Sequence, residues 1–272
     1  MLKVCIVGLS GRMGHVIFDC CQGMEGFKVI SGISKNDNPL PLSFNGERAD
    51  SVEGLTVVPD VFIDFSRPEC SLSVLDYAKE HGCAVVLGTT GFTDDDKSKI
   101  VSTARAVPVV FDANFSVGVN VMLALIKKTA AIMQDADLEI YEAHHRYKVD
   151  APSGTALAMA EAAAEARGVQ LNDVLVAGRN GITGERSYGT IGISSVRGGD
   201  VVGEHNAMFL TDGERVCIEH IATSRATFAR GAIRAASWVS DKKPGLYTMK
   251  EVLGLDLKST HQKLLAYLKI IC

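Results

Sequence analysis

The chain has 272 residues, a length that allows one large domain or two of ordinary size. Hydrophobic residues make up 47% of it and charged residues 22%, a composition that excludes a largely disordered chain. The formal net charge of −4 argues against a global electrostatic attraction to nucleic acid or to an anionic membrane. The apolar runs are too short to span a bilayer, so we expect neither nucleic acid nor membrane as a partner.

The cysteines are odd in number and form no Cys-x-x-Cys pair. Several lie inside apolar runs, which is typical of buried thiols in a reducing compartment and not of a disulfide or zinc framework. The first residues enter a strand pattern at once, without the regions of a secretion signal, so we expect a cytoplasmic protein. The seven cysteines are Cys5, Cys20, Cys21, Cys70, Cys83, Cys217 and Cys272.

In chain order, the first half alternates short apolar runs of strand length with segments of helical spacing. This alternation predicts a parallel sheet covered on both faces, the doubly wound α/β class. The predicted strands are Val4–Val7, Val29–Ile33, Val61–Phe65, Ala84–Leu87 and Val107–Phe111. The predicted helices are Met13–Met24, Glu69–His81 and Asp94–Ala106.

The pattern changes after about residue 115. Several successive strands with one flanking helix predict an α+β layer with an open sheet, hence a second domain. Such a sheet would leave exposed edges and apolar faces in a monomer, so we expect a homo-oligomer. The predicted strands are Leu138–Ala143, Thr190–Val196, Val201–Leu210 and Arg215–Ala222, and the predicted helices are Val119–Met133, Ser153–Arg167 and Arg225–Trp238.

The first predicted strand runs into the glycine-rich segment Gly8–Gly14, which is followed by a helix. Glycines here allow a tight turn, a close approach to a pyrophosphate and close packing of the helix on the strand. The helix N-terminus would then offer free N–H groups to the anion. The spacing is G-x-x-G-x-x-G and not G-x-G-x-x-G, so a purely structural glycine turn is the alternative to nucleotide binding.

The second predicted strand ends at Ser34 and Lys35, twenty positions after Gly14. Sites that prefer NAD usually carry an acid here to hold the ribose hydroxyls, whereas a phosphorylated ribose requires a cation. Ser34 and Lys35 therefore predict that NADPH serves at least as well as NADH. A solvated turn is the alternative.

Cationic side chains crowd the segment His144–Lys148, between a predicted strand and a predicted helix. Ser153–Thr155 then opens the helix, whose N–H groups favour an anion. Converging cations and a helix N-terminus suit a small carboxylate, and a histidine can give up a proton near neutrality. The loop therefore predicts a substrate site.

Three alternatives accompany this interpretation. Glu142 with His144 and His145 could bind a metal, but adjacent histidines rarely converge on one ion without strain, so we expect no metal. A dehydrogenase of the aspartate-semialdehyde type would need a nucleophilic cysteine with a base, and no cysteine lies in such a loop. A non-catalytic nucleotide sensor would keep the glycine loop without a reason for the cationic one.

Several stretches together resemble the dihydrodipicolinate reductase family, whose substrate is now called 4-hydroxy-tetrahydrodipicolinate. The resemblance covers roughly residues 1–255, and its most specific part is His144–Thr155. The matching stretches are Gly8–Gly14, Phe62–Pro68, Gly88–Phe92, Ala113–Asn120, Glu142–Ala156, Gly189–Gly192, Val196–Gly199, Gly203–His205 and Ser224–Arg225.

The resemblance implies a Rossmann-like nucleotide-binding domain built from residues 1–115 and 226–272. It also implies a central α+β domain, residues 116–225, for substrate binding and for oligomerisation as a homotetramer. The implied activity is an oxidoreductase of lysine and diaminopimelate biosynthesis that uses NADPH or NADH. Hydride adds to a ring carbon of a conjugated cyclic imine, water is lost, and an acid delivers the proton.

The resemblance further implies roles for individual residues. His144 and Lys148 would donate protons, and the substrate, a small dicarboxylate, would be held by His145, Ser153, Gly154 and Thr155. The residues implied to line the nucleotide are Gly8, Leu9, Ser10, Gly11, Arg12, Met13, Ser34, Lys35, Gly88, Thr89, Thr90, Asp112, Ala113, Asn114 and Phe115.

Two features depart from the family pattern. Ser34 stands where many relatives carry an acid, and the tail from Asp256 to Cys272 runs beyond the usual end. Apolar residues recur along that tail at helical spacing, which predicts a short packing helix. They are Leu264, Leu265, Leu268 and Ile271.

Overall fold

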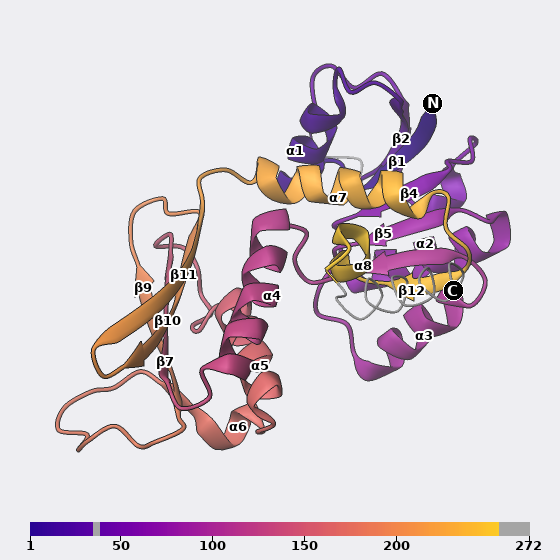
Figure 1. Cartoon of the computed structure of the whole chain (residues 1–272). Coiled ribbons are helices and arrows are strands. Elements are labelled where there is room, and N and C mark those ends of the chain that lie inside the picture. Colours follow the sequence, from indigo (N-terminus) through magenta and orange to yellow (C-terminus); the bar gives the residue numbers. More distant parts are fainter. Residues whose placement is uncertain (35–38, 256–272) are drawn as a thin grey trace, which may run out of the picture. The chain divides into compact units, whose positions relative to one another are not determined.

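The computed structural model describes residues 1–34 and 39–255, so Lys35 and the predicted tail helix lie outside the described residues. The chain divides into two compact units (Figure 1). One consists of Met1–Val117 together with the segment that begins at Ala226, and the other of Gly118–Arg225. In the described part of the chain, no helix combines the length and apolar character needed to cross a bilayer.

The first unit is built on a seven-stranded parallel sheet. Its strands are β1 (Leu2–Val7), β2 (Phe27–Ile33), β3 (Glu47–Ala49), β4 (Val61–Asp64), β5 (Ala84–Leu87), β6 (Pro108–Phe111) and β12 (Gly245–Tyr247). They lie in the order β12-β6-β5-β4-β1-β2-β3. Because β1 pairs with both β2 and β4, the chain order reverses at β1, and ligands of doubly wound sheets bind at the carboxyl ends of such strands.

Helices cover both faces of this sheet, which is why β4 and β5 are buried along their whole length. The helices are α1 (Arg12–Cys21), α2 (Pro68–His81), α3 (Asp94–Ala104), α7 (Ala226–Val239) and α8 (Met249–Leu253), with a 3₁₀ turn at Val52–Gly54. One core joins Phe18 of α1 and Ile233 of α7 to Ile6 of β1. The other joins Leu75 of α2 and Ile100 of α3 to Phe62 of β4.

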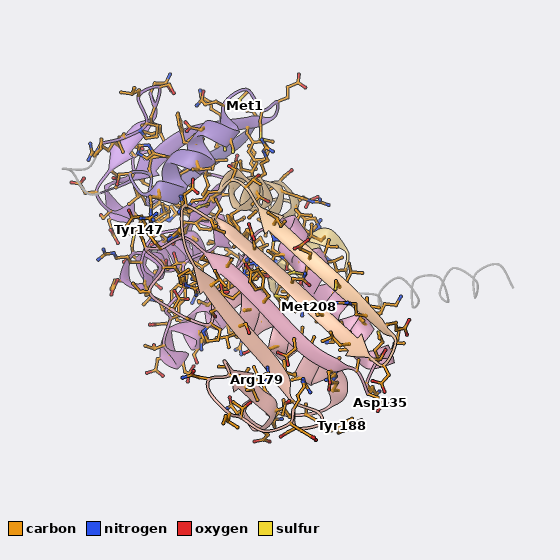
Figure 2. The ribbon with its side chains drawn as sticks, turned by 90° about the vertical axis from the view of Figure 1, so that its left-hand side faces the viewer. Met1, Asp135, Tyr147, Arg179, Tyr188 and Met208 are labelled. Atoms are coloured by element: carbon orange, nitrogen blue, oxygen red, sulfur yellow. The ribbon has the colours of Figure 1, made fainter. Side chains whose placement is uncertain are left out.

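The second unit contains a five-stranded mixed sheet in the order β11-β10-β7-β9-β8. Its strands are β7 (Asp137–His144), β8 (Leu175–Ala177), β9 (Ile191–Arg197), β10 (Gly203–Thr211) and β11 (Glu214–Ala222). Its helices are α4 (Val117–Ile132), α5 (Gly154–Arg167) and α6 (Leu171–Val174). Met122 of α4 and Met159 of α5 pack with Leu138 and Phe209 on one face of the sheet. Figure 2 looks onto the other face, where Met208 lies.

The predicted fold class is confirmed, and each predicted strand and helix that falls within residues 1–34 and 39–255 occurs. The strand Ala84–Leu87 has the predicted bounds, and the other elements are shifted at one or both ends. The predicted helix Met13–Met24 is too long: α1 ends at Cys21 because Gln22 takes an extended conformation and Gly23 has a φ of 76°. The sheet of the second unit is covered by two helices, α4 and α5, and not by one. The elements that the sequence did not predict are β3, β8, β12, α6, α8 and the 3₁₀ turn Val52–Gly54.

Candidate active site

The glycine loop lies at the carboxyl end of β1. Gly8 has a φ of 79°, which favours glycine, and the N–H groups of Gly8 and Leu9 both donate to Ile33 O, at 2.9 and 3.1 Å. A Cβ on Gly14 would lie 2.2 Å from Gly8 O, so α1 approaches the loop as closely as only glycine permits. Among the described residues no side chain caps α1 and no acid lies in its first turn, which fits a phosphate at this helix N-terminus.

A buried hydrogen-bond cluster joins the ends of β4 and β5. Oδ1 of the buried Asp64 accepts hydrogen bonds from Ser66 N (2.9 Å), Ser66 Oγ (2.6 Å) and Thr89 Oγ1 (3.1 Å). Burial raises the pKa of Asp64, against the lowering effect of these bonds. A Cβ on Gly88 would lie 2.3 Å from the ring of Phe65, so the end of β5 also requires glycine. The Thr89 hydroxyl is therefore engaged within the protein, whereas Thr90 is exposed.

The segment Asp112–Phe115 lies at the end of β6. Asp112 accepts from Asn114 N at 3.1 Å and from Met249 N at 3.0 Å, which ties the segment to the start of α8. The Phe115 ring is buried edge-to-face against Phe65, with centroids 5.4 Å apart. The side chains of Leu9 and Phe115 both lie in the core, so only their main chain can face a ligand.

Ser34 follows the end of β2 and is 5% exposed. Its N–H donates to Ala49 O at 2.9 Å because β3 pairs with β2. An acid at this position would repel a ribose phosphate, whereas the hydroxyl of Ser34 carries no charge.

In the second unit, the predicted cationic loop connects β7 to α5. Ser153 caps α5, since its Oγ accepts from Ala156 N at 3.2 Å. A Cβ on Gly154 would meet no atom within 4 Å, so the fold does not require glycine there, and the missing side chain leaves the helix N-terminus open. Lys148 Nζ donates to Asp150 Oδ1 at 2.9 Å. The Nδ1 atom of the half-buried His145 has no hydrogen-bond partner among the described residues.

Glu142 is fully buried at the end of β7 and holds this site together. Arg197 binds it with two hydrogen bonds, from Nη1 to Oε2 (2.9 Å) and from Nη2 to Oε1 (2.7 Å). His144 Nδ1 lies 2.6 Å from Oε2, and Ser153 N donates to Oε1 at 3.2 Å. Burial alone would raise the pKa of Glu142, but side-chain hydrogen bonds from Arg197, Ser195 and His144, that of Arg197 above all, lower it to about 2. Both oxygens are occupied by protein donors, which leaves little room for the metal alternative.

His205 lies beside His144, with ring centroids 5.1 Å apart and planes at 74°. It is 4% exposed, and its Nε2 lies 3.3 Å from Ser153 Oγ. Burial lowers the pKa of His205 to about 4, so this ring is neutral at ordinary pH. Burial also lowers the pKa of His144, although Glu142 acts in the opposite direction.

Sequence reasoning did not place Arg197 or His205 at the site. The strand register brings them there, since Arg197 pairs with His144 across β9 and β7, and His205 pairs with Glu142 across β10 and β7. Both residues belong to stretches that resemble the family, which was the one signal available. Over residues 1–34 and 39–255, no group of three or more His, Cys, Asp and Glu side chains could hold a metal ion.

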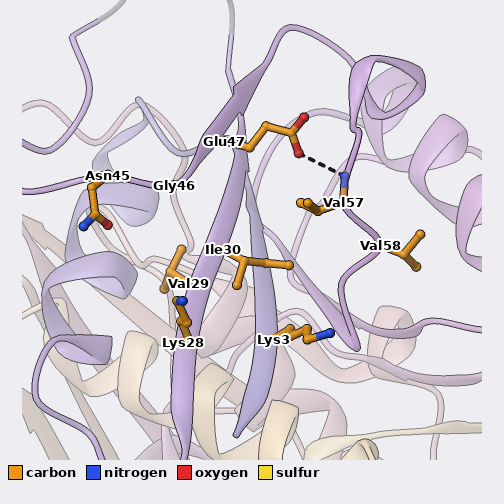
Figure 3. A pocket seen from close by; sticks show the side chains of 9 residues that line it. All are labelled: Lys3, Lys28, Val29, Ile30, Asn45, Gly46, Glu47, Val57 and Val58. Carbon is orange, nitrogen blue, oxygen red and sulfur yellow. Dashed lines mark hydrogen bonds between the residues drawn. The ribbon is translucent and has the colours of Figure 1, made fainter.

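A separate hollow on the first unit lies at the opposite edge of its sheet (Figure 3). Lys3 and Lys28, at the starts of β1 and β2, are among its lining residues, together with Glu47. The Glu47 carboxylate is engaged by Thr56 N and Oγ1, both at 2.7 Å, and by Val57 N at 3.2 Å. This hollow is at the amino ends of the strands, away from the glycine loop, and we assign no role to it.

Two family models match the chain: "Dihydrodipicolinate reductase, N-terminus" over residues 2–115 and "Dihydrodipicolinate reductase, C-terminus" over residues 118–253. The chain belongs to the dihydrodipicolinate reductase family. Like the family, it is an oxidoreductase of lysine and diaminopimelate biosynthesis, as the sequence predicted.

Solved structures agree with this family membership. A dipicolinate-bound dihydrodipicolinate reductase from Paenisporosarcina sp. TG-14 is 25% identical, with a TM-score of 0.78 over 92% of this chain and 98% of that one. The fold is shared with a probable dehydrogenase from Thermotoga maritima, which is 9% identical with a TM-score of 0.59 over 93% of each chain. It is also shared with a myo-inositol dehydrogenase from Corynebacterium glutamicum, which is 14% identical with a TM-score of 0.56 over 94% of each chain.

Proposed function

We propose that residues 1–115 and 226–272 form a nucleotide unit and residues 116–225 a substrate unit. In this dihydrodipicolinate reductase the nucleotide unit holds NADPH or NADH, and the substrate unit holds 4-hydroxy-tetrahydrodipicolinate. The proposal rests mainly on the arrangement of the segment His144–Thr155. It places a histidine on a buried carboxylate, a lysine and an open helix N-terminus on one short stretch of chain.

The substrate carboxylates are bound by Lys148, His145 and the start of α5. An ammonium group and the start of a helix at Gly154 and Thr155 both suit an anion, and the open space at Gly154 admits it. Ser153 shapes this helix start as its cap. The Paenisporosarcina relative was solved with dipicolinate, a small aromatic dicarboxylate, which supports a substrate of this class.

His144 and Lys148 provide the acid. When bound in the first unit, a nicotinamide nucleotide would supply hydride to a ring carbon of the conjugated cyclic imine. The side chains deliver the proton that balances this addition, and the ring hydroxyl leaves as water. A histidine and a lysine next to the bound dianion suit this task because both donate protons and both offset its charge.

Phosphates of the nucleotide bind at Gly8–Met13, with Gly88–Thr90 and Asp112–Phe115 along the same edge of the sheet. The glycine contacts of β1 and β5 fit a ligand that needs close access to the backbone. The uncharged Ser34, with Lys35 after it, supports NADPH as at least an equal of NADH.

The substrate unit also carries the contacts of a homotetramer. Val196 on β9 and Ile221 on β11 are 46% and 52% exposed. The strand register places both on the face of the sheet that carries Met208. Exposed apolar strand residues of this kind are usually covered by a partner. Light scattering at micromolar concentration should detect a tetramer, and a stable species of about 29 kDa would contradict this part of the proposal.

A cytoplasmic location agrees with the free thiols of the six described cysteines. Burial raises the pKa of Cys5 and Cys21 to about 12 and that of Cys83 to about 11, which disfavours a cysteine-nucleophile dehydrogenase.

The deciding experiment follows the oxidation of NADPH and NADH at 340 nm (the nicotinamide band) with freshly made substrate. Substrate-dependent oxidation supports the proposal, and nucleotide binding without turnover would favour a nucleotide sensor.

A further inference from the structure

The carboxylate of Glu142 acts only as an acceptor. Oε1 accepts from Arg197 Nη2 and Ser153 N, and Oε2 accepts from Arg197 Nη1 and lies 2.6 Å from His144 Nδ1. An ionised carboxylate has no proton to donate. The contact with His144 is therefore a hydrogen bond only if Nδ1 carries the hydrogen, which makes Nε2 the ring atom that gains and loses the exchangeable proton.

Arg197 partly neutralises the negative charge of Glu142, which would otherwise act on His144 unopposed. Its two parallel hydrogen bonds to Glu142 have the bidentate geometry that arginine and carboxylate favour. A buried carboxylate without this partner would attract a proton on the imidazole more strongly. Arg197 also donates to Asp150 O at 2.7 Å, so the same side chain holds the loop that carries Lys148.

The groups that face His144 come from each neighbouring element. Glu142 lies on β7, Arg197 on β9, Lys148 on the loop and the neutral His205 on β10. His220 lies next to His205 on the neighbouring strand β11, paired with it in register. Of these five groups, Glu142 favours the charged form of His144, and Arg197 and Lys148 oppose it.

We propose that Glu142 and Arg197 are a positioning pair for the proton donor: Glu142 fixes the Nδ1–H tautomer of His144, and Arg197 sets the pH range in which Nε2 holds its proton. Neither residue touches the substrate in this scheme. The inference rests on the proposed function only for its catalytic meaning, because the tautomer and the titration of His144 belong to the free protein.

The direct test is an NMR titration of the full-length protein with ¹⁵N-labelled histidine and no ligand. The chain has seven histidines, and His144→Gln identifies the signal of His144 by its loss. The ¹⁵N shifts should show a protonated Nδ1 at every pH and an Nε2 that titrates. An Nε2–H tautomer in the neutral form would overturn the proposal.

Two substitutions should move this titration in opposite directions. Arg197→Met leaves Glu142 to act on His144 alone, so the midpoint should rise by roughly one pH unit. Glu142→Gln removes the attracting charge, so the midpoint should fall by a similar amount and the tautomer should become mixed. If the two residues only stabilised the fold, the two variants would not shift the His144 midpoint in opposite directions. Shifts of the same sign in both variants would refute the proposed role of Glu142 and Arg197.

Two further variants separate charge from packing. Arg197→Lys keeps the charge without the paired hydrogen bonds, and the midpoint should stay within a few tenths of a unit of the wild type. Arg179→Met is the control, because Arg179 makes a bidentate pair, at 2.9 Å for both bonds, with Glu139, which lies on β7 like Glu142. Glu139 also accepts from Arg186 Nε at 3.0 Å. A shift of the His144 titration in Arg179→Met as large as in Arg197→Met would contradict a specific role for Arg197.

Kinetics complete the experiment. The pH at which kcat declines on the alkaline side should follow the His144 midpoint across these variants. If the NMR midpoints move as expected while turnover with 4-hydroxy-tetrahydrodipicolinate is absent in the wild type, the proposed function fails and the positioning pair stands. If turnover is normal and the midpoints do not move, the positioning pair fails alone.

Discussion

The nucleotide unit and the substrate unit present their ligand-binding groups in different ways. In the first, backbone atoms face the proposed site, and the close approaches at Gly14 and Gly88 decide what fits. In the second, the side chains of His144 and Lys148 face the proposed site, and His144 is hydrogen-bonded to the buried pair of Glu142 and Arg197. Changes in the first unit should therefore act through steric fit, and changes in the second through charge and pH.

The largest effect is expected in the substrate unit. His144→Ala should lower kcat by about 10²- to 10⁴-fold, because a positioned general acid contributes this much. Lys148→Ala should lower kcat and raise the substrate KM, whereas His145→Ala and Thr155→Val should act mainly on KM. Steady-state kinetics with nucleotide Kd values from fluorescence titration check this. Near-normal turnover in the His144 and Lys148 variants would rule out the site, and lost nucleotide binding would assign the loop to the cofactor.

Acid should destabilise the substrate unit through Glu142. The pKa of Glu142 falls from 4.5 to about 2 on folding, so its contribution is present above pH 4.5 and is lost as the pH falls through about 2. The full contribution is on the order of 3 kcal/mol. Urea unfolding at pH 6 and pH 3 should show a smaller pH dependence for Glu142→Gln than for the wild type. The more exposed Glu139 provides the control. If Glu139→Gln reduced the pH dependence of unfolding as much as Glu142→Gln does, a particular contribution of Glu142 would be contradicted.

A pair of glycine substitutions compares the two units directly. In Gly14→Ala the new Cβ would collide with Gly8 O and Leu9 O, which are backbone atoms. This should cost about 1–3 kcal/mol of stability and abolish nucleotide binding. Gly154→Ala meets open space, so its melting temperature should equal that of the wild type while the substrate KM rises. Thermal denaturation and the two binding assays separate these outcomes, and a large loss of stability in Gly154→Ala would show that this glycine serves the fold.

The smallest effect is expected for Lys35→Ala. A solvent-exposed ion pair contributes about 0.2–1 kcal/mol, so binding of NADPH should weaken by no more than about fivefold, with NADH unaffected. Titrations of both nucleotides at low and moderate salt measure this. A strong NADH preference in the wild type that this substitution does not change would contradict the role of Lys35.

The sequence predicted the long periodic elements, the glycine loop and the cationic loop, because each is a local pattern. It did not predict β3 and β12, since three residues are too few to show a period. Nor did it predict the contact of Glu142 with Arg197, which are 55 residues apart and meet through the register of β7 and β9. That register follows from the packing of Leu138 and Ile191, a tertiary property.

The position of Asp64 is another feature that the sequence alone could not predict. An acid at the end of a strand usually faces solvent or a ligand, and only the structure shows that this one is buried beneath Ser66 and Thr89. Phe65 was likewise part of a matching stretch without a role. Its ring occupies the space that a side chain at Gly88 would need. Phe65 and Gly88 come close together because β4 pairs with β5, which the sequence alone does not show.

The chain leaves the first unit after Val117 and returns to it at Ala226, which has a consequence for biosynthesis. Ala232 and Ile233 of α7 belong to the same core as Ile6 of β1, and a Cβ on Gly231 of α7 would meet Phe115 O at 1.7 Å. A ribosome therefore completes Gly118–Arg225 before it delivers the helix that covers one face of the parallel sheet. During that interval the nascent chain exposes apolar strands, the state in which newly made proteins aggregate or recruit chaperones. A released chain truncated after Arg225 should be protease-sensitive in residues 1–117 while the inserted unit is already resistant.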